Sequence, residues 1–320
     1  MKQAAPSFLR RLFSFTAIFL FLALMRGDLC ARAQVVRGGR IRTDVNLVNV
    51  WVNVQDASGR PVTGLPREAF SVFDEGTKQQ VAVFEAETQQ PLDLALMIDT
   101  SLSAAKEMEF EGAAAMRFIR KVLRPQDSLA LYTFAEHVDR LTPFTSNPMT
   151  LESGLKRMHG GAGTSLYDAI YLSSGELARL QQGRRRVIVL VTDAGETTSR
   201  VTFEDARHAA VTAEALIYTV VVRAFRSDAL RDLAGEHALA TITDTTGGAM
   251  FLADDLNQLD GLFEEIDREL RTQYLLAFYP QPTPPKKSIR HLEVRVASAA
   301  AAGPMRIRNR RIYLTDGGPE

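Results

Sequence analysis

The sequence predicts an α/β fold in which a doubly wound, mostly parallel sheet is inserted into a small β-sandwich. Two observations support this prediction. Apolar strands alternate with helices from residue 91 to residue 271, an order typical of a parallel sheet with helices on both faces. Segments with only β character flank this region on both sides. Because the ends of a domain often lie close together, the two flanks can pair with each other around the insertion.

Residues 1–33 are predicted to be a secretory signal peptide. Basic residues precede an apolar run over residues 12–25, which is shorter than the ~20 residues that span a membrane. The small-x-small pattern of residues 31–33 predicts cleavage before Gln34. We therefore expect an exported protein (periplasmic, envelope-associated or secreted) without a membrane span after cleavage. An uncleaved membrane anchor is the alternative.

The composition of the mature chain limits its partners and its chemistry. Cleavage removes five basic residues and one acidic residue, which takes the 38 basic and 38 acidic residues to 33 and 37 and the net charge to −4. This balance does not favour nucleic acid as a partner. Cleavage also removes Cys30, the only cysteine. The mature chain can therefore form neither an internal disulfide nor a thiolate metal site.

Residues 34–90 and residues 272–320 are the two predicted β segments. In the first, valines alternate with period two in "VNVWVNV", and "FSVFDEG" and "QQVAVFEAE" follow as short strands around a turn. In the second, the expected strands are "QYLLAFYP", "RHLEVRVAS" and "MRIRNRRIYL". A sheet as small as the first segment cannot bury both of its faces alone. We therefore expect the two segments to share one sandwich.

Residues 91–271 supply the strands and helices of the inserted sheet. The expected strands are nearly continuous apolar runs, as in strands buried on both faces: "LDLALMID", "SLALYTFA", "RRVIVLVTD", "LIYTVVV" and "GAMFLA". The expected helices have helical periodicity: "AAKEMEFEGAAAMRFIRKVL", "SLYDAIYLSSGELARLQ", "FEDARHAAVTAEA", "SDALRDLAGEH" and "DLNQLDGLFEEIDREL".

Oxygen-bearing side chains follow two of these strands and one glycine-rich loop. Asp99, Ser101 and Ser103 form D-x-S-x-S after the first strand, Thr164 follows "GGAG" just before a helix, and Asp193 ends the strand "RRVIVLVTD". Ligands of doubly wound sheets bind outside the carboxyl ends of the strands, so we expect these residues at one edge. Carboxylates and hydroxyls form an all-oxygen set, which suits Mg²⁺, Ca²⁺ or Mn²⁺ rather than zinc or copper.

The order of these residues resembles the metal-ion-dependent adhesion site of von Willebrand factor A domains, which have a Rossmann-like fold. The resemblance covers residues 92 to about 270, and all five positions of the motif match. The flanks resemble the bacterial secreted VWFA-related family. The resemblance implies one divalent cation, with Mg²⁺ as the first candidate. It implies Ser101, Ser103 and Thr164 as direct ligands in at least one state, and Asp99 and Asp193 as direct or water-mediated ones.

The resemblance further implies that a carboxylate from a protein partner completes the shell of the cation. Only two of the five expected ligands are charged, so the ion would stay electrophilic and could exchange a water for an acidic group of the partner. We therefore expect a non-enzymatic protein-binding module that serves adhesion or assembly.

Three alternatives use the same residues differently. A metal-dependent hydrolase would need a general base near the ion, for which Glu196 is the nearby loop candidate. Ser103 and Lys106 have the Ser-x-x-Lys spacing of acyl enzymes, but the S-D-N and K-T-G motifs of those enzymes do not occur in the sequence. Finally, Ser101 or Ser103 could simply cap the next helix, which would leave the other two segments unexplained.

Three smaller features lead to weaker expectations. The basic triplet of residues 184–186 is expected to be solvated. Asp168 lies four residues after Thr164 on the same helix face, where it could support the site or only stabilise the helix N-terminus. Trp51 could be exposed in the sandwich or buried against the inserted domain.

Overall fold

The computed structural model describes residues 47–86, 89–101, 108–223, 232–285, 288–297 and 303–315. The predicted signal peptide, Ser103 and Lys106 lie outside the described residues, so the expectations about them stay predictions. Val45–Glu320 form one structural unit. Within the described part of the chain, no helix is long and apolar enough to cross a membrane.

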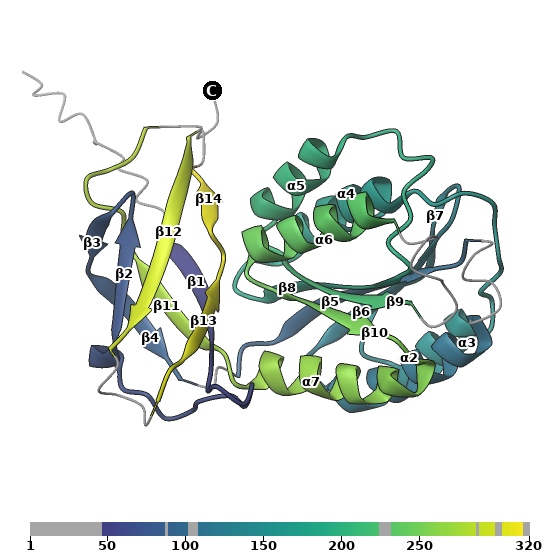
Figure 1. Cartoon of the computed structure of the whole chain (residues 1–320), viewed down its shortest axis with the longest axis horizontal. Coiled ribbons are helices and arrows are strands. Elements are labelled where there is room, and N and C mark those ends of the chain that lie inside the picture. Colours follow the sequence, from purple (N-terminus) through teal and green to yellow (C-terminus); the bar gives the residue numbers. More distant parts are fainter. Residues whose placement is uncertain are drawn as a thin grey trace, which may run out of the picture. The chain divides into compact units, whose positions relative to one another are not determined.

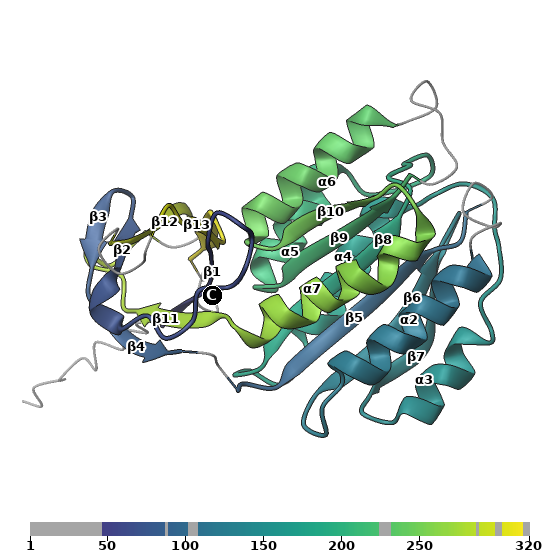
Figure 2. The same ribbon diagram turned by 60° about the horizontal axis from the view of Figure 1, so that its bottom comes forward.

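A six-stranded sheet forms the centre of the inserted part (Figure 2), in the order β10-β9-β8-β5-β6-β7. All neighbours pair in parallel except β6 and β7, which are antiparallel. Every residue of β5 is buried, as its nearly continuous apolar sequence predicts. The strands are β5 (Leu92–Asp99), β6 (Ser128–Phe134), β7 (Val138–Thr145), β8 (Arg185–Thr192), β9 (Leu216–Val222) and β10 (Ala249–Ala253).

Helices cover both faces of this sheet (Figure 1). One face packs against α2 (Met108–Val122), α3 (Pro148–Leu155) and α7 (Leu259–Arg271), with the short 3-10 turn η3 (Leu256–Gln258) before α7. The other face packs against α4 (Leu166–Ala178), α5 (Phe203–Thr212) and α6 (Leu233–Thr246). Each face has its own apolar core, so the predicted doubly wound α/β arrangement is confirmed.

Two four-stranded antiparallel sheets form the sandwich, in the orders β13-β1-β11-β4 and β14-β12-β2-β3. Strands from before and after the insertion pair within both sheets, for example Val50 with Leu276 and Val72 with Val294. The valines on one side of β1 lie in the sandwich core. The elements are β1 (Val48–Gln55), η1 (Arg67–Ala69), β2 (Phe70–Asp74), β3 (Thr77–Gln79), β4 (Val81–Glu85), β11 (Tyr274–Phe278), β12 (Ile289–Val296), β13 (Arg306–Asn309) and β14 (Ile312–Leu314).

Several elements differ from the expectation. β7 and α3 are additional to the predicted elements, and the expected last strand is divided into β13 and β14. The helix expected over residues 227–237 begins outside the described residues, and α6 (Leu233–Thr246) continues past its expected end. Its second half is rich in threonine, which is a weak helix former. These hydroxyls donate to carbonyls one turn earlier, for example from Thr243 to Leu239 at 2.9 Å, so they are satisfied inside the helix.

The expectation that residues 184–186 are solvated is wrong for Arg185. This side chain is fully buried and donates to the side-chain oxygen of Gln273 at 3.0 Å and the Gln90 carbonyl at 3.3 Å. Its guanidinium lies 5.5 Å from the ring centre of Trp51, which is buried against the core of the inserted part. Burial, followed by the nearby charge of Arg271, lowers the pKa of Arg185 to about 10.

Arg185→Lys is expected to lower the free energy of unfolding by about 3 kcal/mol, because each buried acceptor left without a donor costs about 1–3 kcal/mol. A lysine ammonium cannot reproduce the planar fork of the guanidinium. Chemical denaturation measures the effect. The matched control is Arg120→Lys, since Arg120 is 63% exposed and forms only a surface ion pair with Glu152. Equal losses in the two variants would contradict the structural role of Arg185.

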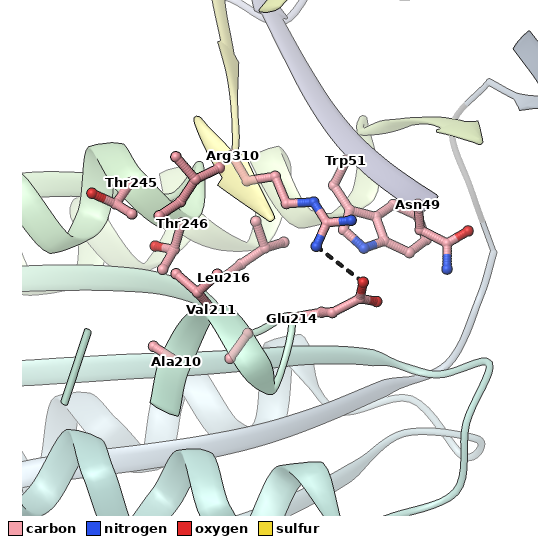
Figure 3. A pocket seen from close by; sticks show the side chains of 11 residues that line it. Asn49, Trp51, Ala210, Val211, Glu214, Leu216, Thr245, Thr246 and Arg310 are labelled. Atoms are coloured by element: carbon pink, nitrogen blue, oxygen red, sulfur yellow. Dashed lines mark hydrogen bonds and ion pairs between the residues drawn. The ribbon is translucent and has the colours of Figure 1, made fainter. Parts of the chain in front are cut away.

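A small cavity lies between β1 and the helices α5 and α6 (Figure 3). Trp51 and Arg310 are among its lining residues, and Arg310 forms an ion pair with Glu214 at 3.0 Å. Its volume of about 10 Å³ corresponds to roughly one water molecule. The cavity is therefore too small for a ligand larger than water.

Candidate metal centre

Asp99 is the last residue of β5, and its side chain is 1% exposed. One carboxylate oxygen accepts from the backbone N–H of Ser101 at 2.9 Å. The other accepts from the hydroxyl of Thr192, at the end of the neighbouring strand β8, at 2.7 Å. Hydrogen bonds from two segments therefore fix the orientation of this carboxylate at the sheet edge.

Asp193 follows β8 directly and is 6% exposed. Its Oδ1 accepts from the backbone N–H of Gly195 at 2.9 Å. Between them Ala194 is buried and has a φ of 68°, which is unusual for a residue with a Cβ. Its N–H donates to the Thr192 hydroxyl at 3.1 Å. Thr192 therefore links the carboxylate of Asp99 to the turn that presents Asp193.

Thr164 lies just before α4, in the loop that the glycine-rich sequence predicts. Its N–H donates to the Thr197 hydroxyl at 2.8 Å, and its carbonyl accepts from the N–H groups of Thr197 and Thr198. The same loop reaches the β5 end, where the N–H of Gly161 donates to the Thr100 carbonyl at 2.9 Å. Three segments far apart in sequence thus meet at this edge.

The side chains of Asp193 and Thr164 approach the same point beside Gly195. A Cβ built on Gly195 would lie 3.0 Å from Oδ1 of Asp193 and 3.6 Å from Oγ1 of Thr164. The glycine therefore leaves a small space that any other side chain would fill. The structure brings together Asp99, Ser101, Thr164 and Asp193, while Ser103 lies outside the described residues.

The two carboxylates of this edge repel each other electrostatically. Burial and, second, the charge of Asp193 together raise the pKa of Asp99 to about 6, against hydrogen bonds from Ser101 and Thr192. A cation between the carboxylates would offset both effects. Carboxylates and hydroxyls suit a hard cation. Within the described ranges no group of three or more His, Cys, Asp or Glu side chains could hold a metal, so the fit depends on hydroxyls.

Thr192, Ala194 and Gly195 contribute to this edge but are not among the residues predicted from the sequence. A signal for Thr192 was present, because a hydroxyl at the end of an otherwise apolar buried strand needs a hydrogen-bond partner. The strained backbone of Ala194 gave no signal, since alanine rarely adopts a positive φ. Asp168, which could support the site or only stabilise the helix N-terminus, accepts from the backbone N–H of Val201 at 3.0 Å.

The fold and this edge define a class: an α/β domain with a parallel sheet, helices on both faces and a candidate divalent-cation site at the carboxyl ends of its strands. Residues 94–196 match the family model of the von Willebrand factor type A domain. The chain therefore contains a von Willebrand factor type A domain, as the resemblance implied. No curated protein matches the chain significantly.

Several solved structures are similar to the chain. BatB, a conserved hypothetical protein from Bacteroides thetaiotaomicron, is 15% identical with a TM-score of 0.45, over 56% of this chain and 98% of that chain. A von Willebrand factor type A protein from Catenulispora acidiphila is 10% identical with a TM-score of 0.49, over 87% and 76%. Proximal thread matrix protein 1 from the mussel byssus, with a zinc-occupied MIDAS motif, is 15% identical with a TM-score of 0.48, over 61% and 48%.

Proposed function

We propose that this protein is an exported, non-enzymatic binding module that recognises a protein partner through one divalent cation. Asp99, Ser101, Ser103, Thr164 and Asp193 hold the cation, with Mg²⁺ as the first candidate. The partner supplies a carboxylate. The observation that supports this most strongly is the convergence of three segments, which place two carboxylates and neutral hydroxyls at one buried edge.

The charged and the neutral residues of the site have different roles. Asp99 and Asp193 provide the negative charge that attracts a cation into a buried position. Ser101 and Thr164 provide neutral oxygens, which leave the net charge of the ligand set low. A bound cation would supply the electrophilic centre to which an acidic side chain can bind. The site thus favours a partner with an exposed aspartate or glutamate.

The contacts of Glu196 favour binding over hydrolysis. A general base must be able to accept a proton from a water molecule. Glu196 instead accepts from the N–H of Ser199 at 2.9 Å through Oε1, and from the hydroxyl of Ser199 at 2.6 Å through Oε2. Oε2 also accepts from the N–H of Tyr167 at 3.1 Å. Both oxygens therefore stabilise the loop, which supports the non-enzymatic proposal.

The test is capture of partners from an envelope fraction of the source organism by the immobilised mature chain. We expect specific proteins to be retained with Mg²⁺ and released by EDTA. Asp99→Ala should retain none of them, because it removes a charged ligand of the cation. Quantitative mass spectrometry of the eluates measures the difference. Recovery of the same proteins by the wild type and by Asp99→Ala would refute the proposal that this edge is the binding surface.

A further inference from the structure

The N-terminus of α4 is capped by a different segment of the chain. Ser165 occupies the N-cap position, but its side chain makes no capping hydrogen bond. The first N–H groups of a helix have no partner within the helix. Here the N–H of Tyr167 donates to Glu196 at 3.1 Å and to the Ser199 hydroxyl at 3.0 Å, and the N–H of Asp168 donates to the same hydroxyl at 3.3 Å.

The capping is reciprocal. Asp168, in the first turn of α4, accepts through Oδ1 from the backbone N–H groups of Arg200 at 2.9 Å and Val201 at 3.0 Å. The helix therefore holds the loop after β8, and the loop holds the helix. We call Asp168, Glu196 and Ser199 the reciprocal cap. Its two carboxylates also interact favourably with the positive end of the helix dipole.

The reciprocal cap connects two of the proposed cation ligands. Thr164 lies two residues before the start of α4, and Asp193 lies three residues before Glu196. Between these points the backbone of Thr164 is already bound to Thr197 and Thr198. The two segments can therefore shift relative to each other only if these bonds strain or break together with those of the reciprocal cap.

We propose that Glu196 and Asp168 are positioning residues of the cation site: the reciprocal cap sets the separation of Thr164 and Asp193 before the cation binds. This inference rests on the proposed function. It gives Glu196 a role that differs from that of a general base. Residues that orient the ligands of a metal contribute strongly to its affinity, although they do not touch the ion.

The test measures the binding of Mn²⁺ alone to the mature chain by electron paramagnetic resonance, which reports free and bound Mn²⁺ separately. Glu196→Gln keeps the shape but places an amide N–H₂ where an acceptor is needed. Asp168→Ala removes the acceptor on the other side, because one oxygen, Oδ1, accepts both bonds there. We expect each variant to bind Mn²⁺ roughly 10–100-fold more weakly, the range found for residues that orient metal ligands.

The matched control is Glu204→Gln. Glu204 also lies in the first turn of a helix, but it is exposed and pairs with Arg207 within α5. We expect its Mn²⁺ affinity to stay within about twofold of the wild type, since surface pairs contribute little. The double variant Glu196→Gln/Asp168→Ala should lose less affinity than the sum of the single losses predicts, because both changes break one unit.

Hydrogen exchange of the metal-free chain tests the reciprocal cap without any cation. The amides of Tyr167 and Arg200 should exchange faster in Glu196→Gln and Asp168→Ala than in the wild type. Faster exchange with unchanged Mn²⁺ affinity would overturn the inference, and so would lower affinity with unchanged exchange. If the wild type binds no Mn²⁺, the proposed function fails instead. If either variant does not fold, Ser199→Ala provides the same comparison with a smaller change.

Discussion

Asp99→Asn is expected to abolish the stabilisation of the protein by Mg²⁺. A ligand that binds only the folded state at one hundred times its Kd stabilises that state by about 2.7 kcal/mol. The wild type should gain about this amount from Mg²⁺, and the variant should gain nothing. Thermal unfolding with EDTA and with Mg²⁺ measures both values.

The same substitution is expected to stabilise the metal-free protein at pH 7. The pKa of Asp99 is raised from 3.8 to about 6 in the folded state. Its contribution to stability is therefore fully present below pH 3.8 and is lost as the pH rises through about 6. Asparagine removes the buried charge, and the Thr192 hydroxyl can accept from the new amide.

The advantage of Asp99→Asn in EDTA should thus disappear below about pH 4, where the wild-type carboxyl is protonated as well. A gain from Mg²⁺ that is equal in the wild type and in the variant would show that Asp99 does not hold the cation. Lower stability of the variant in EDTA at pH 7 would show that the hydrogen bonds of Asp99 outweigh its repulsion by Asp193.

Gly235→Ala is expected to disturb the turn that carries Asp193, because α6 packs against this turn. Gly235 lies in the first turn of α6, and a Cβ there would come within 1.8 Å of the carbonyl oxygen of Ala194, next to Asp193. The helix or the turn must therefore shift. We expect the free energy of unfolding to fall by about 1–3 kcal/mol, as for other overpacked positions. The affinity for Mg²⁺ should fall roughly 10–100-fold, as for other changes beside metal ligands.

Gly175→Ala is the matched control for this substitution. Gly175 lies within α4, and a Cβ there would have no neighbour within 4 Å. Because alanine is the better helix former, the control should gain about 1 kcal/mol of stability and keep its affinity. Chemical denaturation and Mg²⁺ titration measure both variants. If Gly235→Ala behaves like the control, the turn around Ala194 is not tightly packed against α6.

Most of the fold could be predicted from the sequence, because its strands and helices differ clearly in periodicity. β5 and β9 both have the predicted bounds. β7 was missed because an edge strand with a proline and exposed charged residues lacks the apolar run of the buried strands. α3 is short, and short helices give weak periodic signals.

The candidate site was predictable where the chemistry resides in side-chain type and order. Asp99, Ser101, Thr164 and Asp193 have oxygen atoms at the ends of predictable elements. The groups that orient these side chains were harder to predict from the sequence. The contacts of Glu196 depend on the path of the loop after β8, and the close approach of Gly235 depends on how α6 packs. Both are tertiary features without a local sequence pattern.

The strand pairs of the sandwich have a consequence for the order of folding. β1 pairs with β11 and β13, and β2 pairs with β12, so both sheets need strands from the two ends of the chain. Closing such long loops is entropically costly and slow unless an intervening structure brings the ends together. The inserted domain can fold from nearer contacts and does bring them together. During synthesis, the valine-rich β1 therefore remains without its sheet partners until β11 and then β13 emerge, a stage at which exposed strand edges are prone to aggregation.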